Sequence, residues 1–321
     1  MISVITTNYN YSEFISEAIS SILNQTIRDF EYIIVDDGST DDSESVIQMF
    51  NDNRIRFFKI NRVGRTAALN FAIKKATYDI IALMDADDIA HPSRLEKELE
   101  LLKKQNQLVF CNTAFFKDKR IKYLVKNPES YLELKRKIFL HGHLNNSSAL
   151  FYKDHLIKNA GYDESLQAYE DYDLWLRLLD KSEFIIVNGL HHYMRLHKGS
   201  LTTSNQNKLK HLLYSIQKKY FNDGFPFYRS LDQYQKNLLS GWREFFYGSK
   251  SSARFFWKKI NLSELSTKVM LCFLLSYLPD SFLDLIKKNR IKLRLDFTLK
   301  KFFDYRSIQK EFNVIRKNLN A

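Results

Sequence analysis

The feature that most constrains the fold is a regular alternation of short apolar runs with segments of helical periodicity over residues 1–110. Four runs predict strands: Ile2–Thr6, Tyr32–Val35, Arg54–Ile60 and Ile80–Met84. Helices are predicted at Ser12–Leu23, from about Ser39 to Phe50, at Thr66–Ala76, and from Pro92 to about Lys104. Strands that alternate with helices form mostly parallel sheets with right-handed crossovers. We therefore expect an α/β fold whose mostly parallel sheet is flanked by helices.

Acidic clusters follow two of these strands directly. Asp36-Asp37 comes after the second strand, and Asp85-Ala86-Asp87-Asp88 comes after the fourth. In open α/β sheets, ligands bind beyond the carboxyl ends of the strands. Asp85 and Asp87, spaced two apart, can converge on one Mg²⁺ or Mn²⁺ that also binds phosphate oxygens. The alternative is that both clusters are turns or helix caps.

Two further segments carry candidate functional groups. Glu170-Asp171 opens a predicted helix, where the acids either complement the helix dipole or supply a general base. Arg195-x-His197 follows a strand-like run at Phe184–Val187, and Arg195 is a candidate phosphate contact.

Several function classes are excluded by composition and by missing motifs. Hydrophobic residues make up 45% of the chain, which is enough for a sizeable core, and two cysteines are too few for a disulfide framework. The chain has no GxxxxGK[ST], no GxGxxG after the first strand, no GxSxG and no HExxH. Because MISVITTNYN leads straight into a strand pattern without a basic leader, we expect a cytoplasmic protein.

Positive charge is concentrated in the last part of the chain. Residues 1–200 carry 26 Lys and Arg against 28 Asp and Glu, whereas residues 201–321 carry 23 against 9. The apolar run Val269–Leu278 is too short to span a bilayer, and a basic cluster follows it: Lys287, Lys288, Arg290, Lys292 and Arg294. Three interpretations of 265–294 stay open: peripheral contact with the inner membrane face, a packed core helix, or a homodimer contact.

Six segments of the first 200 residues resemble one known family in their order along the chain. They are VITTNYNYSEFISEAISSILNQT (Val4–Thr26), EYIIVDDGSTDDS (Glu31–Ser43), GRTAALNFAI (Gly64–Ile73), ALMDADDIAHPSRL (Ala82–Leu95), SSALFYK (Ser147–Lys153) and GYDESLQAYEDYDLWLRL (Gly161–Leu178). Together they resemble the family 2 glycosyltransferases of the GT-A fold. The resemblance implies a GT-A catalytic domain at 1–200, with nucleotide-sugar binding in 1–110 and the acceptor side in 111–200. Residues 201–321 are then a basic helical extension.

The resemblance also assigns roles to individual residues. It implies inverting transfer from a UDP-sugar to a glycan or lipid-linked acceptor, with Asp171 as the catalytic base. Substrate contacts are implied for Thr6, Tyr9, Asp36, Asp37, Arg65, Asp85, Glu170 and Arg195. Mn²⁺ or Mg²⁺ is implied at Asp85, Asp87 and His197. One departure is Ala68, where many relatives carry a basic residue.

Two other functions are compatible with parts of the sequence. A sugar nucleotidyltransferase also combines a parallel sheet with metal-binding carboxylates, but it needs a glycine-rich and basic phosphate loop that TTNYNYSEF does not provide. A nucleic-acid-binding module could use the basic tail, yet it leaves the ordered acidic motifs unexplained. We therefore expect no nucleic-acid partner.

Overall fold

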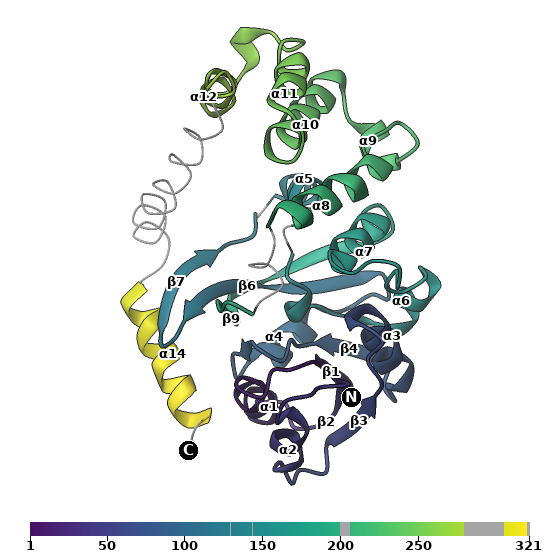
Figure 1. The fold of residues 1–321 in the computed structure, drawn as a ribbon, viewed down its shortest axis with the longest axis vertical. Helices are drawn as coiled ribbons and strands as arrows, with labels where there is room; N and C mark the ends of the chain where they lie inside the picture. Colours follow the sequence, from purple (N-terminus) through teal and green to yellow (C-terminus); the bar gives the residue numbers. More distant parts are fainter. Residues whose placement is uncertain (129, 143, 200–205, 279–304, 320–321) are drawn as a thin grey trace. The chain divides into compact units, whose positions relative to one another are not determined.

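The computed structural model describes residues 1–128, 130–142, 144–199, 206–278 and 305–319. The chain forms two compact units (Figure 1). The first unit comprises Met1–Ile138, Gly142–Lys198 and Phe303–Ala321, and the second comprises Phe139–His141 and Gly199–Phe302. The last helix therefore belongs to the first unit, although the sequence analysis assigns it to the extension.

The first unit combines one sheet with helices on its faces. Its strands are β1 (Ile2–Asn8), β2 (Phe30–Asp37), β3 (Ile55–Ile60), β4 (Ile80–Leu83), β5 (Ile89–Ala90), β6 (Gln107–Lys117), β7 (Arg120–Val125), β8 (Leu150–Tyr152) and β9 (Glu183–Arg195). Its helices are α1 (Ile15–Leu23), α2 (Ser43–Gln48), α3 (Arg65–Lys75), α4 (Arg94–Leu101), α5 (Tyr131–His141, which ends in the second unit), the 3₁₀ turn η1 (Asn146–Ser148), α6 (Lys153–Lys158), α7 (Glu170–Leu178) and α14 (Tyr305–Leu319).

The sheet is parallel in its first half and mixed in its second. Within the described residues the strand order is β3-β2-β1-β4-β8-β6-β9-β5, and β7 pairs with β6. The pairs β2–β3, β1–β2 and β1–β4 are parallel, as predicted. β8 then lies antiparallel between β4 and β6, β6 and β9 are parallel, and β5 and β7 pair antiparallel with β9 and β6. The acidic ends of β2 and β4 therefore reach the same edge of the sheet.

The main core lies between α1 and the parallel strands. Ile15, Ala18, Ile19 and Ile22 of α1 are buried at helical spacing and pack in one cluster with side chains of β1 and β2. Complete burial of an aliphatic side chain of this size contributes roughly 1.5–3 kcal/mol. This packing fixes β1 and β2, and with them the edge of the sheet where the acidic residues lie.

β9 is much longer than the sequence predicts. The apolar run suggests only Phe184–Val187, but the strand continues through Arg195. Its pairing with β6 shifts register near Cys111 and Asn112, where Asn188 and Gly189 interrupt the apolar pattern. Because the strand continues past this irregularity, His192 and Arg195 reach the loop that follows β4.

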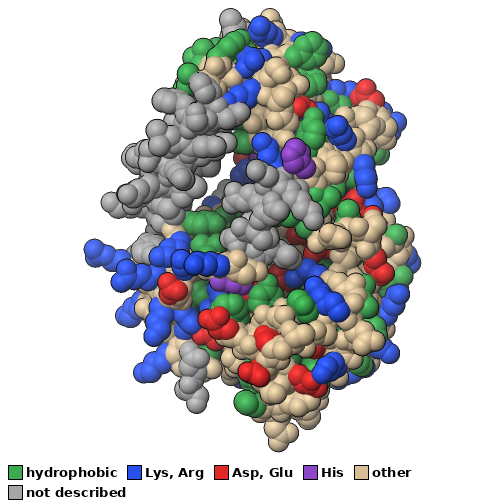
Figure 2. All heavy atoms as spheres, viewed as in Figure 1, with side chains coloured by type: hydrophobic (Ala, Val, Ile, Leu, Met, Phe, Trp, Pro, Cys, Tyr) green, Lys and Arg blue, Asp and Glu red, His purple; other side chains and the backbone are tan. Residues whose placement is uncertain are grey.

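α14 packs against β6 and β9 within the first unit. Ile308, Phe312 and Ile315 form one buried cluster with residues that include Phe116 of β6 and Tyr193 of β9. The ring centroids of Phe312 and Phe116 are 4.8 Å apart. Figure 2 shows Lys and Arg side chains gathered over the region where α14 and β7 lie.

The second unit is helical in its described residues. It contains α8 (Gln206–Tyr220), α9 (Pro226–Ser230), α10 (Gln233–Phe246), α11 (Lys250–Trp257), the 3₁₀ turn η3 (Leu262–Glu264) and α12 (Thr267–Leu275). Trp257 is the centre of its core, and a Cβ at Gly241 would lie only 2.1 Å from the Trp257 Nε1, so only glycine fits there. None of the described helices is long and apolar enough to cross a membrane.

Candidate active site

The candidate site lies at the carboxyl ends of β1, β2 and β4. Asn8 is the last residue of β1 and donates from Nδ2 to Asp36 Oδ1 of β2 at 2.8 Å. The Ser39 amide donates to the other oxygen of Asp36 at 3.0 Å. Asp36 is completely buried, so these bonds fix the corner between the two strands.

Asp37 is bound to the loop before α3. It accepts hydrogen bonds from the amides of Val63 at 2.7 Å and Gly64 at 3.0 Å, and it pairs with the guanidinium of Arg62. The Arg62 guanidinium also lies over the Tyr9 ring, 3.6 Å from its centroid. The structure thus brings Tyr9 and Asp37 together, through an arginine that the sequence analysis missed. A basic residue three positions before Arg65 was the available signal.

Thr6, a predicted substrate contact, lies in the interior of the first unit. Its side chain is 0% exposed, and its hydroxyl bonds to the Tyr32 hydroxyl at 2.9 Å. Alternation along β1 directs Thr6 to the same face as Ile2 and Val4, which lies in the core.

Three carboxylates after β4 form the one group of possible metal ligands found among the described residues. Asp85, Asp87 and Asp88 each offer an oxygen, and these oxygens lie within 4.8 Å of one another. Carboxylate oxygens suit Mg²⁺ and Mn²⁺. His197 Nε2 lies 2.9 Å from Asp87 Oδ2, so the structure also brings His197 to this group. The residues present therefore fit a hard divalent cation.

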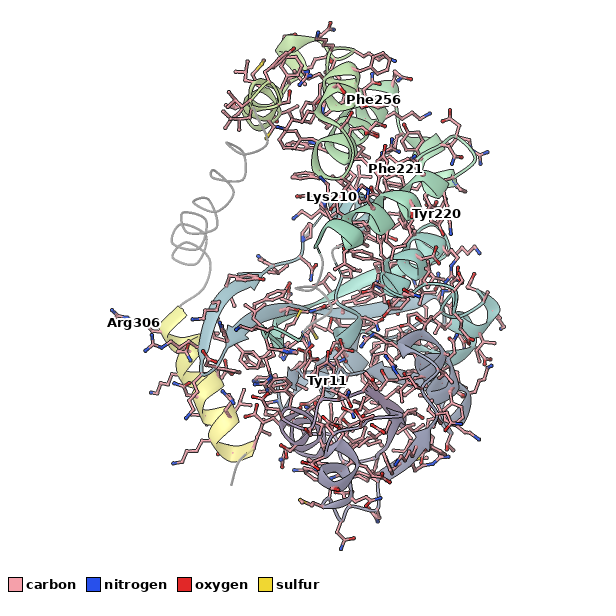
Figure 3. The ribbon with its side chains drawn as sticks, in the orientation of Figure 1. Tyr11, Lys210, Tyr220, Phe221, Phe256 and Arg306 are labelled. Atoms are coloured by element: carbon pink, nitrogen blue, oxygen red, sulfur yellow. The ribbon has the colours of Figure 1, made fainter. Side chains whose placement is uncertain are left out.

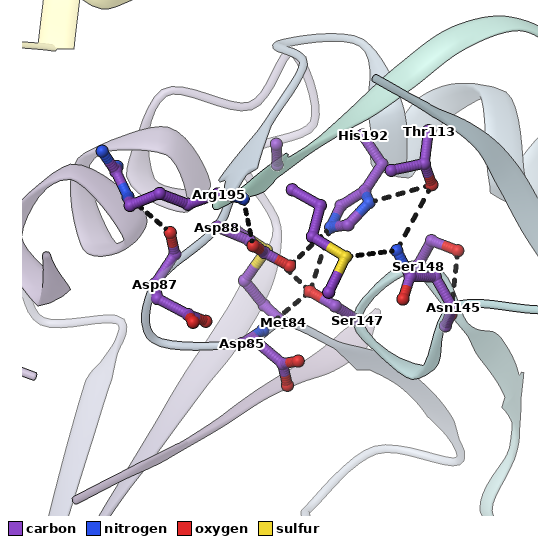
Figure 4. A network of polar contacts seen from close by, with 12 residues as sticks. Met84, Asp85, Asp87, Asp88, Thr113, Asn145, Ser147, Ser148, His192 and Arg195 are labelled. Carbon is purple, nitrogen blue, oxygen red and sulfur yellow. Dashed lines mark hydrogen bonds and ion pairs between the residues drawn. The ribbon is translucent and has the colours of Figure 1, made fainter. Parts of the chain in front are cut away.

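Asp88, which the sequence analysis did not select, joins the loop to β9. The Arg195 amide donates to Asp88 Oδ1 at 3.0 Å, and His192 Nε2 lies 3.1 Å from Asp88 Oδ2 (Figure 4). Burial, reinforced by the negative charge of Asp85, raises the pKa of Asp88 to about 7. Burial, with the positive charge of Arg94, lowers the pKa of His192 to about 3, so this imidazole is neutral at neutral pH.

Ser147 bonds to the start of the loop that follows β4, at Asp85. Its hydroxyl accepts from the Asp85 amide at 2.9 Å and lies 3.0 Å from His192 Nε2. In Figure 4 the Asp88 carboxylate turns toward His192 and Ser147, while those of Asp85 and Asp87 point to the opposite side of the loop.

Arg65 connects the loop after β4 to the start of α7. Its Nη2 donates to Asp85 Oδ1 at 2.7 Å, and its Nε donates to Glu170 Oε1 at 2.8 Å. The three side chains are 7–26% exposed, so the pairing is only partly screened by water. The structure thereby brings together Arg65, Asp85 and Glu170, which come from three separate segments.

Asp171 occupies the first turn of α7 beside Glu170. One of its oxygens accepts from the Tyr172 amide at 2.7 Å. Burial, and then the negative charge of Glu170, raises the pKa of Asp171 to about 7. Tyr169, two residues before Asp171, has a φ of 59°, a left-handed conformation that is unusual for a tyrosine. Strained backbone of this kind occurs at functional sites.

The Arg195 side chain contacts the main chain of the loop rather than the carboxylates of Asp85 and Asp87. Its Nε donates to the Asp87 carbonyl at 2.8 Å, and its Nη2 pairs with Glu17 of α1. The side chain is only 7% exposed. The hydrogen bonds and ion pair described for the guanidinium are thus with the main chain of the loop and with Glu17 of α1.

Tyr11 is a further residue that the sequence analysis missed as a site residue. Its ring lies edge-on to His197, with centroids 5.6 Å apart, and the residue is partly buried in the first unit (Figure 3). Burial, and then the negative charge of Asp87, raises the pKa of its hydroxyl. The segment NYNYSEF contained the only signal for it.

The chain is similar to known glycosyltransferases. Residues 3–159 match the model of "Glycosyl transferase family 2". The chain is 36% identical over 193 residues to the O-antigen biosynthesis glycosyltransferase WbnJ of Escherichia coli, covering 56% of this chain and 72% of WbnJ. The chain belongs to glycosyl transferase family 2.

Another relative of this family 2 glycosyltransferase is an uncharacterised glycosyltransferase of Methanocaldococcus jannaschii. The two are 36% identical over 188 residues, which is 56% of this chain and 64% of the archaeal protein. The prediction that the chain is a transferase enzyme is confirmed by these relatives.

Solved structures of two glycosyltransferases share the fold. Residues 1–349 of S. aureus TarS, in complex with UDP-GlcNAc, match with a TM-score of 0.60 at 16% identity, over 99% of this chain and 91% of that fragment. The mannosyltransferase PcManGT of Pyrobaculum calidifontis, in complex with GDP-Man and Mn²⁺, matches with a TM-score of 0.56 at 16% identity, over 99% of this chain and 85% of that one. The predicted GT-A type of α/β fold is confirmed.

Proposed function

We propose that this glycosyltransferase transfers a sugar from a UDP-linked donor to a hydroxyl of a glycan or lipid-linked acceptor, with inversion at the anomeric carbon. The observation that carries the proposal is that Arg65 connects a cluster of carboxylates suited to a cation with a helix that carries a candidate general base. Asp85 and Asp87 form a cluster suited to a cation, while Asp171 holds a raised pKa on a separate helix. Arg65 joins the two groups through Asp85 and Glu170.

Asp171 is the proposed general base. In the proposed step the acceptor oxygen attacks the anomeric carbon, and the hydroxyl proton passes to the Asp171 carboxylate. The bond between that carbon and the phosphate oxygen breaks, and the nucleoside diphosphate leaves with the electron pair. A base works best when its pKa lies near the operating pH, and a pKa of about 7 meets this condition.

Asp85 and Asp87 would hold Mn²⁺ or Mg²⁺, with His197 bonded to Asp87. A bound divalent cation neutralises the negative charge that develops on a departing diphosphate. Arg65 orients Asp85, since its guanidinium donates a hydrogen bond to that carboxylate. Asp88 and Arg195 hold the loop from behind.

The proposed site of the nucleotide base, formed by Tyr9, Arg62 and Asp37, is suited to a pyrimidine. Tyr9 offers an exposed ring at the rim, and Arg62 lies over it. Asp37 fixes the neighbouring loop through two amides, and its carboxylate is the proposed partner of the uracil N3–H. TarS was solved with a uridine nucleotide and PcManGT with a guanosine nucleotide, so donor choice needs a direct test.

A thermal-shift screen of nucleotide sugars, with and without Mn²⁺, tests donor and cation together. A ligand that binds only the folded state raises the melting temperature, by an amount that grows with its concentration over its Kd. We expect UDP-sugars with Mn²⁺ to give the largest shift. If no nucleotide sugar stabilises the protein under either condition, the proposed function is wrong.

We also propose that α12 brings the enzyme to the cytoplasmic face of the inner membrane. Leu271 and Leu274 of α12, with Tyr277 and Leu278 in the turn just after it, are 36–59% exposed. Arg254 lies over the Tyr277 ring at 4.5 Å, and Figure 2 shows hydrophobic beside basic side chains in the region of α11 and α12. The basic cluster of residues 287–294 lies outside the described residues. An apolar helix face beside basic residues favours an anionic lipid surface.

A further inference from the structure

Glu17 of α1 is shared by two arginines from distant parts of the chain. Arg195 pairs with Glu17 Oε2, and Arg316 of α14 donates from Nε to Glu17 Oε1 at 3.1 Å. The three side chains are 7%, 12% and 17% exposed for Arg195, Glu17 and Arg316. Burial opposes the ionisation of Glu17, but the hydrogen bonds and charges of Arg316 and Arg195 outweigh it and lower its pKa.

Aromatic rings hold both guanidinium groups in place. The Arg195 guanidinium lies 4.8 Å from the Phe14 centroid and 4.6 Å from that of Phe116. Arg316 lies 5.8 Å from the same Phe116 ring and 5.9 Å from Phe312. Planar guanidinium groups stack well on aromatic faces, so these rings help to fix the orientation of both arginines.

The opposite side of Arg195 faces the candidate metal loop. Its Nε donates to the Asp87 carbonyl at 2.8 Å, and its own amide donates to Asp88 Oδ1 at 3.0 Å. Arg195 therefore holds the main chain of Asp87 and the side chain of Asp88 at the same time. A continuous series of polar contacts runs from α14 through Arg316, Glu17 and Arg195 to the loop that carries Asp85 and Asp87.

We propose that Arg316, Glu17 and Arg195 are positioning residues that set the geometry of the cation-binding loop, so that α14 is part of the donor half of the active site. The inference rests on the proposed function, because it concerns the cation that the loop would hold. Residues that orient metal ligands from behind typically contribute about 10- to 100-fold to metal affinity or activity.

Arg316→Gln separates positioning from simple charge effects. Removal of a positive charge near an acidic loop strengthens cation binding if only through-space electrostatics acts. Positioning predicts the reverse, because Glu17 then loses one partner and Arg195 loses its fixed orientation. We expect Arg316→Gln to weaken Mn²⁺ binding by about 10-fold, measured by calorimetry on the full chain in the presence of UDP.

Three further variants separate the effect of charge from the effect of losing the Arg316 guanidinium. Lys317→Gln removes the same charge from an exposed neighbouring position of α14 and should not weaken Mn²⁺ binding. Arg316→Lys keeps an ion pair with Glu17 and should restore most of the affinity. The double variant Glu17→Gln with Arg316→Gln should bind Mn²⁺ no more weakly than the weaker single variant, because residues that act in series are not additive.

Hydrogen–deuterium exchange of the loop peptide gives a reading that does not depend on metal. Arg316→Gln and Glu17→Gln should each speed exchange at residues 85–90, and Glu17→Gln serves as the main variant if Arg316→Gln does not fold. Unchanged exchange in a folded variant, or Mn²⁺ binding in Arg316→Gln as tight as in the wild type, overturns the inference alone. Failure of the wild-type protein to bind Mn²⁺ with UDP overturns the proposed cation site as well.

Discussion

Arg65 donates a hydrogen bond from Nη2 to Asp85 Oδ1 at 2.7 Å. Its Nε is committed at the same time to Glu170, the residue before the proposed base. A lysine has one ammonium group in place of this fork and cannot reproduce both bonds with the same geometry. Arg65 therefore connects the loop after β4 to the start of α7 through one side chain.

Removal of the Asp87 carboxylate should abolish transfer without unfolding the chain. Asp87→Asn keeps the size of the side chain and an oxygen that can pair with His197, but it loses the negative charge that a divalent cation requires. We expect loss of nearly all transfer activity in a radiolabelled-sugar assay, with an unchanged circular dichroism spectrum. Asp154→Asn, an exposed carboxylate of α6, is the matched control and should keep full activity. Full activity of Asp87→Asn, or of the wild type in a chelator, contradicts the cation site.

UDP should bind more tightly than GDP or CDP. A carboxylate at Asp37 accepts the uracil N3–H, whereas cytosine presents a lone pair at that position and guanine is larger. A site built around such a bond discriminates strongly against a base that lacks it. Calorimetry with the three nucleotides in Mn²⁺ is the measurement, and we expect UDP to be favoured by at least about 10-fold. Equal affinities would remove the uridine assignment and leave the fold and the transferase assignment intact.

Asp171→Asn should separate chemistry from donor binding. The amide cannot take the acceptor proton, so turnover should fall by a factor of about 100 or more. Asp171 has no described contact with Asp37 or Asp87, and the affinity for UDP should therefore stay within about twofold of the wild type. Loss of UDP binding together with turnover would show that Asp171 is a structural or donor-binding residue instead.

The same substitution should stabilise the protein at higher pH. The pKa of Asp171 is raised to about 7 by burial and by Glu170, against about 3.9 in an unfolded chain. The folded state therefore holds a proton that the unfolded state releases, and stability is lost as the pH rises from about 4 to about 7. Asn cannot ionise, so the melting temperature of Asp171→Asn should exceed that of the wild type by more at about pH 8 than at about pH 5, without added metal. A difference that is constant over this range is the contrary result.

The first half of the fold could be predicted because its signals are local. The apolar runs of β1 to β4 and the acidic residues after β2 and β4 are contiguous in sequence, and the rule for parallel sheets brings their ends together. The extent of β9 was missed because its second half is polar and its register shifts near Asn112. That half carries His192 and Arg195, so the support behind the loop could not be predicted from periodicity.

The contacts between distant segments could not be predicted from the sequence either. Glu17 and Arg316 are 299 residues apart, and no pattern within either helix indicates that they meet. The bond between Thr6 and Tyr32 was not predicted, because motif resemblance gives a position in the sequence but not the face of the strand. Arg62 and Asp88 were visible as residue types beside known motifs, yet their roles depend on the loops that fold over them.

The protein should bind anionic vesicles through the exposed face of α12 and the basic residues that follow it. Each Lys or Arg near an anionic surface contributes about 1 kcal/mol, and salt screens this attraction. In co-sedimentation with phosphatidylglycerol vesicles, we expect binding at low salt that falls at high salt and is absent with neutral vesicles.

Leu271→Ser with Leu274→Ser should reduce binding at both salt concentrations, because these two side chains are 43% and 59% exposed. Replacement of Lys287, Lys288, Arg290, Lys292 and Arg294 by Gln should remove the salt-dependent part. If the wild-type protein stays in the supernatant with anionic vesicles at low salt, the α12 face belongs to a packing or dimer contact, and light scattering would then detect the dimer.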